Sequence, residues 1–242
     1  MESAVFLLSI VGGLKMLSIN DLLREKENDR NRAGKSVWGN IDKTGFFYHV
    51  VTKSWNGDKI FTKEIADYRH NLLCKLCGEA GITILFSVTM TNHTHDVVMT
   101  PSWEVLSDVM RVLDSRVSIL VRKLLENRIS RKRPVFSRGP AYIVLRDPVS
   151  VMCEGKYAFD NPAYMRAEKQ FVPHSCFWMF EKNYFVYPYD EKVYLKLFGM
   201  RGDEIYALYS EKSASEVRAF AQSRFANWTK AQIEAVFYRK TS

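Results

Sequence analysis

Short runs of aromatic and β-branched residues recur in the middle of the chain and predict four β-strands. The runs are Gly45–Lys53, Ile82–Met90, His93–Met99 and Ala141–Leu145. Only Thr91 and Asn92 separate the second run from the third, which predicts a hairpin between these two strands.

Apolar residues at helical spacing predict three helices between and after these strands, over residues 62–81, 100–127 and 147–157. Thr62 is the expected N-cap of the first helix, and Asn56-Gly57 predicts a turn before it. Strand, helix, strand, strand, helix, strand is the order of a ferredoxin-like βαββαβ fold. The sequence therefore predicts an α+β fold, with an antiparallel sheet, helices on one face and a further helix that carries Tyr157.

The ends of the chain are less regular. Residues 1–43 predict a helical extension and linker, residues 44–190 the main domain, and residues 191–242 a helical, basic C-terminal extension. Within these parts we expect Phe177–Tyr189 to be a strand or a packing loop, and we expect helices over residues 213–226 and 230–238.

Composition and charge narrow the function. The 242 residues carry 35 Lys+Arg against 27 Asp+Glu, a formal net charge of +8, and 47% of them are hydrophobic. This content excludes a disordered or low-complexity chain, and the positive charge favours an acidic partner, nucleic acid first. The densest basic stretch is a loop without acidic residues, whose candidate DNA-binding residues are Arg128, Arg131, Lys132, Arg133 and Arg138.

No segment predicts a membrane span, because the apolar run Ala4–Leu14 is too short to cross a bilayer. The order of Glu2 before this run and Lys15 after it is the reverse of a signal peptide. Four cysteines are present, and we interpret the Cys74-x-x-Cys77 pair as reduced thiols in a helix, with a redox or zinc role as the alternative. The expected location is the cytoplasm, associated with the nucleoid.

Two segments carry candidate chemistry. His93 and His95 lie two apart in a predicted strand, so both imidazoles point to one face, as metal binding requires. Tyr157 and Asn161 lie four apart at the end of a predicted helix and share a face. Taken singly, each segment is also compatible with an ordinary structural role.

Together, the segments resemble the single-tyrosine HUH transposases, and most closely the REP-associated tyrosine transposases. Met90–His95 is similar to the signature Met-Pro-Asn-His-x-His, with Thr91 in place of Pro, and Phe47–Val51 is similar to the opening strand of the family. Tyr157, Asn161 and Pro162 follow the pattern of the tyrosine helix, and the resemblance extends to Ala167. Thr94 and Asp96 depart from the family, which usually has apolar residues there.

The resemblance implies a metal-dependent endonuclease and strand transferase that acts on single-stranded DNA at hairpins with flanking guide bases. His93, His95 and Asn161 would hold Mg²⁺ or Mn²⁺, and Tyr157 would form a 5′-phosphotyrosine intermediate. Trp103, Tyr142 or Trp178 could stack on unpaired bases or belong to the core. The chain would act as a monomer or a homodimer.

Three alternatives remain open at this stage. The first is a non-catalytic nucleic-acid-binding protein on the same sheet, and the second is a replication-initiator or relaxase type of HUH nuclease. The third is a domesticated or decayed transposase that binds single-stranded DNA without moving it.

Overall fold

The computed structural model describes residues 46–229 except 128, 131, 138 and 165–174, and in addition residues 231, 232 and 235. The extension predicted over residues 1–43, with its apolar run Ala4–Leu14, lies outside the described residues, as does most of the helix predicted over 230–238. The division of the chain at residues 44 and 191 therefore stays a prediction.

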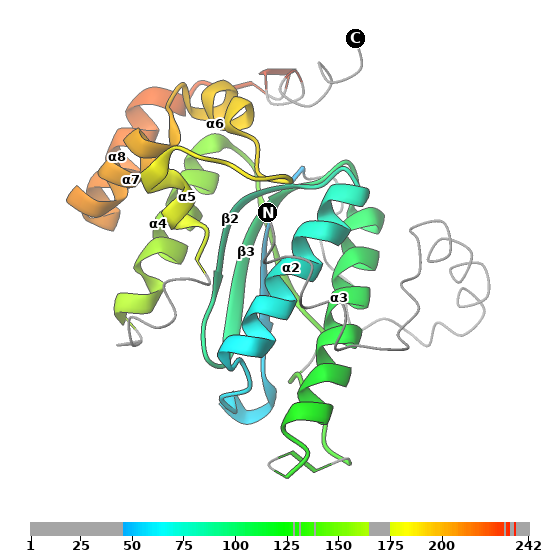
Figure 1. Cartoon of the computed structure of the whole chain (residues 1–242). Coiled ribbons are helices and arrows are strands. Elements are labelled where there is room, and N and C mark those ends of the chain that lie inside the picture. The colour runs from blue at the N-terminus through cyan, green and yellow to red at the C-terminus, as the bar shows by residue number, and fades with distance from the viewer. Residues whose placement is uncertain are drawn as a thin grey trace. The chain divides into compact units, whose positions relative to one another are not determined.

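A four-stranded antiparallel sheet forms the centre of the fold (Figure 1). Its strands are β1 (Phe47–Lys53), β2 (Thr83–Thr89), β3 (His93–Met99) and β4 (Ala141–Leu145). They lie in the spatial order β2-β3-β1-β4, and every neighbouring pair is antiparallel. All four predicted strands and the β2–β3 hairpin are confirmed.

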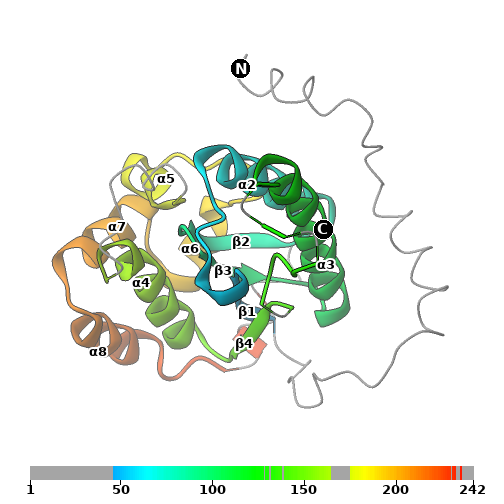
Figure 2. The same cartoon turned by 90° about the horizontal axis from the view of Figure 1, so that it is seen from below.

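The first two α-helices cover one face of this sheet (Figure 2). They are α2 (Lys63–Glu79) and α3 (Trp103–Leu124), and the short 3₁₀ helix η1 (Trp55–Gly57) forms the predicted turn before α2. The side chain of Thr62 accepts a hydrogen bond from the backbone of Ile65, which confirms the predicted N-cap. This arrangement confirms the ferredoxin-like plan, and none of the helices within the described residues is long and apolar enough to cross a membrane.

Helix α4 (Pro148–Tyr164) lies on the opposite face of the sheet (Figure 2). It continues seven residues beyond the end predicted at Tyr157, and Pro162 is accommodated in its last turn. Close packing requires a glycine at position 155, because a Cβ there would lie 2.6 Å from the ring of Phe86 and 2.5 Å from the hydroxyl oxygen of Tyr209. The backbone of α4 therefore packs directly on aromatic side chains.

The described C-terminal residues form four more helices beside α4 (Figure 1). They are α5 (Phe177–Lys182), α6 (Glu191–Phe198), α7 (Gly202–Glu211) and α8 (Ala214–Phe225). Helix α8 was predicted individually, whereas α6 and α7 were expected only as part of a helical extension over residues 191–242. The alternative of a strand over Phe177–Tyr189 is wrong because its first part is α5. An aromatic cluster centred on Phe86 of β2 joins these helices to the sheet, through the rings of Phe177, Phe180, Tyr194, Phe198 and Tyr209.

The cysteines are all unpaired thiols. Cys74 and Cys77 lie in α2, as the helical interpretation of this pair predicted, and Cys77 is buried. Burial raises the pKa of the Cys74 thiol to about 12. A thiol with so high a pKa is a weak nucleophile and a weak metal ligand at neutral pH, which favours the structural role.

A buried ion pair ties α2 to β3. The Arg69 guanidinium donates to both carboxylate oxygens of Asp96, and the exposed fraction of each residue is 1% or less. The hydroxyl of Ser87 donates to the same carboxylate at 2.8 Å. Burial, and to a lesser degree the charge of Asp96, raises the pKa of the nearby Asp114 carboxyl to about 7, although Arg69 opposes the shift.

The ion pair predicts a non-additive effect on stability. The Arg69→Met substitution leaves the Asp96 carboxylate buried without its cation and should cost about 3–5 kcal/mol in the free energy of unfolding. The double substitution Arg69→Met with Asp96→Val should recover most of that loss, because neither charge then remains buried. Urea unfolding of the four proteins of this cycle measures the coupling, and additive effects would show that the pair does not act as a unit.

Candidate active site

The candidate site is the interface between α4 and the face of the sheet formed by β1 and β3. His93 and His95 alternate with Thr94 along β3, so both imidazoles point towards α4. Tyr157 and Asn161 are one turn apart on the facing side of α4. The structure therefore brings together all four residues that the two motifs singled out.

The amide of Asn161 lies between the two histidines of β3. Its Oδ1 atom is 3.2 Å from Nε2 of His93, and its Nδ2 atom is 3.1 Å from Nε2 of His95. The two imidazole rings are perpendicular, with centroids 4.9 Å apart. Three side chains from two elements thus direct polar atoms to one point.

Tyr157 stands at the edge of this group. Its ring centroid is 5.2 Å from that of His95, in an edge-to-face arrangement, and 46% of the residue is exposed. The side chain borders an open cleft of about 1230 Å³, which also contains His93, His95 and Asn161. The cleft is therefore open enough for a backbone phosphate of a single-stranded nucleic acid to reach the phenol and the histidines together.

The electrostatic environment keeps the two histidines of β3 neutral. Burial, and to a lesser degree the neighbouring His49 and His93 rings, lowers the pKa of His95 to about 2. Burial also lowers the pKa of His93, although the hydrogen bond that the protonated ring would donate to Oδ1 of Asn161 opposes the shift. Neutral imidazole is the form that binds a metal ion, so both rings are in the state that coordination needs.

The donor set fits a divalent metal ion. Oδ1 of Asn92 lies 2.7 Å from Nδ1 of His93, closer than the 3.2 Å between Oδ1 of Asn161 and Nε2. The proton of the neutral ring is therefore assigned to Nδ1, and Nε2 keeps a lone pair that can bind a metal ion. Two imidazole nitrogens and an amide oxygen suit Mn²⁺ better than Mg²⁺, which prefers oxygen ligands. No group of three or more His, Cys, Asp or Glu residues with metal-binding geometry occurs in the described residues, so the amide of Asn161 is essential to this set.

The basic loop lies beside the cleft, although the described part contributes only two of its predicted DNA-binding residues. Arg128, Arg131 and Arg138 lie outside the described residues, Lys132 is exposed, and Arg133 forms an ion pair with Asp58. Backbone hydrogen bonds pair the loop with the end of β1, since Trp55 N donates to Val135 O at 2.9 Å. DNA binding by this loop stays a prediction, and the ion pair reduces the charge that Arg133 offers.

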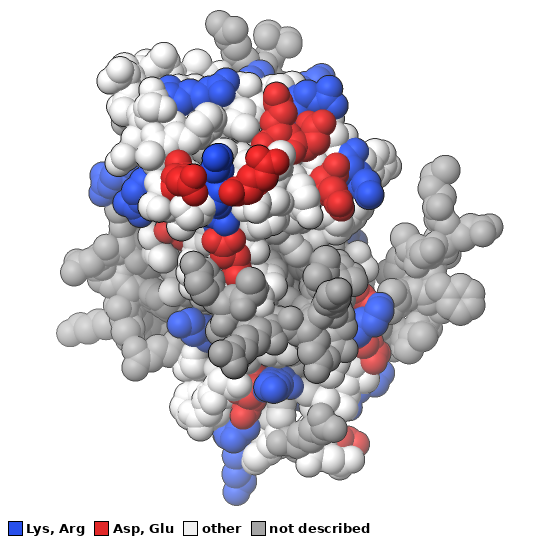
Figure 3. Space-filling model, turned by 90° about the vertical axis from the view of Figure 1, so that its left-hand side faces the viewer, with Lys and Arg blue, Asp and Glu red and all other residues white. Residues whose placement is uncertain are grey.

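The aromatic residues proposed for base stacking divide between core and surface. Trp103 is buried, and its ring centroid is 4.6 Å from that of Tyr142, on the α3 side of the sheet. These two rings belong to the core, whereas 40% of Trp178 is exposed. On the side that the C-terminal helices occupy, acidic and basic side chains are interspersed (Figure 3), so this face does not form a uniform cationic surface.

Three further titratable residues of the cleft were not predicted from the sequence as parts of the site: His49, Lys53 and Glu154. His49 and Lys53 share the cleft face with Val51 by the alternation of β1, and Val51 pairs with His95. His49 belongs to the Phe47–Val51 segment of the resemblance, and the same alternation would have placed it beside β3. Glu154 lies three residues before Tyr157, a spacing that puts both on one side of a helix.

Residues 42–143 match the family model described as "Transposase IS200 like". Over these residues the chain is similar to the IS200-like transposases. The matched segment contains β1, β2, β3 and most of β4, and with them His93 and His95, whereas Tyr157 and Asn161 follow it. This result confirms the transposase resemblance inferred from the motifs.

Two solved structures are similar to the chain. One is a REP-associated tyrosine transposase bound to a REP hairpin, with 14% identity over 60% of this chain and 84% of that chain, and a TM-score of 0.44. The other is a Deinococcus radiodurans R1 protein assigned as a transposase, with 12% identity over 56% of this chain and 98% of that chain, and a TM-score of 0.36. No curated protein sequence matches the chain.

The site predicts metal binding that depends on an amide. We expect the Asn161→Ala variant to bind Mn²⁺ about tenfold or more weakly than the unmodified protein, because the amide oxygen that would bind the ion is lost. Isothermal titration without DNA measures this affinity. Asn71→Ala makes the same change on the exposed surface of α2 and should leave the affinity unchanged; equal effects of both variants would exclude Asn161 as a ligand.

Proposed function

We propose that the protein is a metal-dependent, single-stranded DNA endonuclease and strand transferase of the IS200-like transposase type, with Tyr157 as its nucleophile. The observation that supports this most directly is the convergence of Tyr157, Asn161 and the two β3 histidines on one cleft. Two histidines and an amide beside an exposed phenol are the groups that a phosphotyrosine mechanism needs. The transposase-like segment of the sheet supplies the histidines.

In the proposed reaction, the phenol oxygen of Tyr157 attacks a backbone phosphorus and the bond from phosphorus to the 3′ oxygen breaks. The products are a free 3′ hydroxyl and a 5′-phosphotyrosine. The phenol proton passes to water because Tyr157 is open to solvent, and the departing 3′ oxygen takes a proton from water. One phosphodiester replaces another, so the reverse reaction rejoins strands without an external energy source. The exchange therefore serves both cleavage and strand transfer.

His93, His95 and Asn161 are the residues that would hold the metal ion. A bound divalent ion supplies polarisation of the scissile phosphate and stabilises its developing negative charge. The protein side chains keep the site in place: Asn161 spans the two rings, and α4 carries the amide and the nucleophile on one rigid element. A hairpin as substrate, and action in the cytoplasm on the chromosome as monomer or homodimer, are further parts of this proposal that rest on the motif resemblance.

Incubation with single-stranded hairpin oligonucleotides from the flanks of its own gene tests the nuclease directly. In Mn²⁺ we expect a covalent protein–DNA adduct that survives denaturing electrophoresis and that EDTA prevents. Tyr157→Phe should abolish the adduct and retain DNA binding, because only the nucleophilic oxygen is removed. The matched control is Tyr184→Phe, since 62% of Tyr184 is exposed on the loop after α5.

The outcomes separate the alternatives. An adduct that persists in Tyr157→Phe would show that another residue is the nucleophile. Binding of the oligonucleotides without any adduct in Mn²⁺ or Mg²⁺ would instead identify a non-catalytic or decayed transposase, and would overturn the enzyme proposal.

Lys53 allows a second, independent test, which asks whether single-stranded DNA enters the cleft. It is exposed at the end of β1 and borders the cleft, where its charge also contributes to the lowered pKa of His93. Lys53→Ala should weaken single-stranded DNA binding and should reduce the slope of log K against log salt by about 0.7, the value for one phosphate contact.

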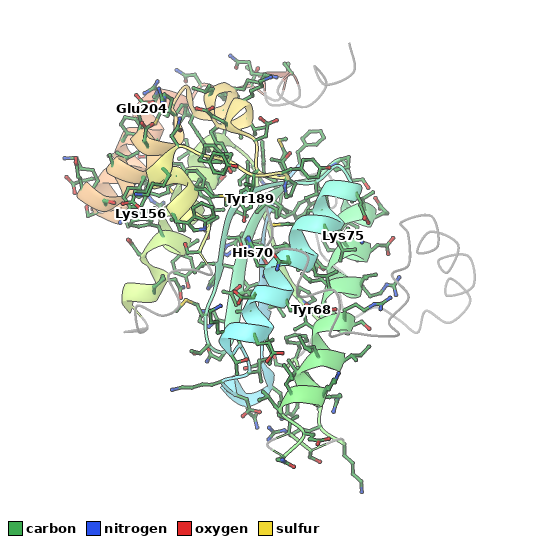
Figure 4. The ribbon with its side chains drawn as sticks, in the orientation of Figure 1. Tyr68, His70, Lys75, Lys156, Tyr189 and Glu204 are labelled. Atoms are coloured by element: carbon green, nitrogen blue, oxygen red, sulfur yellow. The ribbon has the colours of Figure 1, made fainter. Side chains whose placement is uncertain are left out.

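Lys75→Ala is the control for this measurement. Lys75 lies on α2, on the other side of the sheet from Lys156 of α4 (Figure 4), and 45% of its side chain is exposed. Fluorescence anisotropy at several salt concentrations compares the two variants. An equal change of slope in both would mean that DNA does not enter the cleft beside Lys53.

A further inference from the structure

His49 and Glu154 connect the metal-binding strand to the tyrosine helix. Nε2 of His49 lies 2.9 Å from Nδ1 of His95, and the exposed fractions of the two residues are 1% and 3%. On its other side, Nδ1 of His49 lies 2.7 Å from Oε2 of Glu154, in a contact less well aligned than a good hydrogen bond. The three side chains form a continuous chain from α4 through β1 to β3.

The positions of the protons on His49 and His95 follow from the carboxylate of Glu154. A carboxylate only accepts, so the nitrogen of a neutral His49 that faces Glu154, Nδ1, carries the proton. Nε2 of His49 is then a lone pair, and it can accept only if Nδ1 of His95 carries a proton. The remaining nitrogen of His95, Nε2, is left with a lone pair that faces His93 and that accepts from Nδ2 of Asn161 at 3.1 Å.

We infer that His49, held by Glu154, is a positioning residue that fixes His95 in the tautomer with Nε2 directed into the candidate metal site. The reverse arrangement would place the proton on Nε2 of His95 and block that nitrogen as a ligand. A ligand histidine whose second nitrogen is held by a carboxylate-linked partner is oriented and more basic, which strengthens metal binding. The inference rests on the proposed metal site, yet the tautomer itself exists without metal or DNA.

The position of Glu154 adds a second consequence. Glu154 lies one turn before Tyr157 on α4, and both border the same cleft. Because Glu154 contacts His49 of β1, the three linked side chains also hold the turn of α4 that carries Tyr157 against the sheet. One set of contacts therefore fixes both the ligand and the helix that carries the nucleophile.

Two-bond ¹H–¹⁵N correlation spectra of the metal-free protein test the tautomer directly. We expect His95 to carry its proton on Nδ1, and a proton on Nε2 in the unmodified protein would overturn the inference whatever the variants do. In His49→Phe the ring volume is kept and the acceptor is lost, so the tautomer should no longer be fixed. In His49→Gln the amide oxygen can accept from His95, so the Nδ1 proton should return.

Mn²⁺ affinity, measured by titration calorimetry, gives the second readout. We expect His49→Phe to weaken Mn²⁺ binding about 10–100-fold and His49→Gln to restore much of the loss. His70→Phe is the matched control, since it makes the same change on α2 (Figure 4), where the His70 ring stacks on Tyr189 with centroids 6.3 Å apart. Unchanged Mn²⁺ affinity in a folded His49→Phe protein would overturn the positioning role.

The results also separate this inference from the proposed function. A fixed Nδ1 tautomer with His49-dependent Mn²⁺ binding, but no DNA adduct, would retain the positioning role and reject the nuclease. An adduct that forms normally together with a His95 proton on Nε2 would retain the nuclease and reject the role of His49.

Discussion

The two-residue alternation of β3 is the constraint on which the rest of the structure depends. His93 and His95 point to α4, so Thr94 and Asp96 must point to the opposite face, towards α2 and α3. The same seven residues thus supply the candidate ligands on one side and part of the core on the other. A shift of register by one residue would exchange the two faces and destroy both at once.

The candidate site also requires a fixed distance between α4 and the sheet. Gly155 allows its backbone to touch the aromatic cluster of Phe86 and Tyr209, and any larger residue would lift the helix. On the same helix, Nζ of the buried Lys156 donates to the backbone oxygen of Tyr209 at 2.9 Å and pairs with Asp160. The C-terminal helices, which contribute Tyr209, therefore help to determine where Asn161 and Tyr157 meet the histidines.

The sequence was sufficient to predict the sheet, its two covering helices and the four residues that converge, because strand alternation and helical spacing are local properties. It predicted a helical extension over residues 191–242 but did not distinguish α6 and α7 within it. Both helices are short, at 8 and 10 residues, and both bury tyrosines, Tyr194 and Tyr209, a residue type that is also common in strands. His49 was missed because its role depends on the pairing of β1 with β3, and pairing joins residues 46 positions apart. The charge of Arg133 was overestimated for a similar reason, since its partner Asp58 is 75 positions away.

The departures from the motif at Thr94 and Asp96 have a structural explanation that leaves the chemistry intact. Both residues lie on the core face of β3, behind the histidines, where the family usually has apolar side chains. Asp96 is compensated by Arg69 and Ser87, whereas the buried hydroxyl of Thr94 makes no hydrogen bond within the described part of the chain. An uncompensated buried hydroxyl lowers the stability of the fold. It does not change the direction of the imidazoles, because the backbone of β3 and the contacts of Asn161 and His49 set that direction. Thr94 and Asp96 therefore affect the stability of the sheet, whereas the candidate metal ligands of the cleft lie on the opposite face of β3.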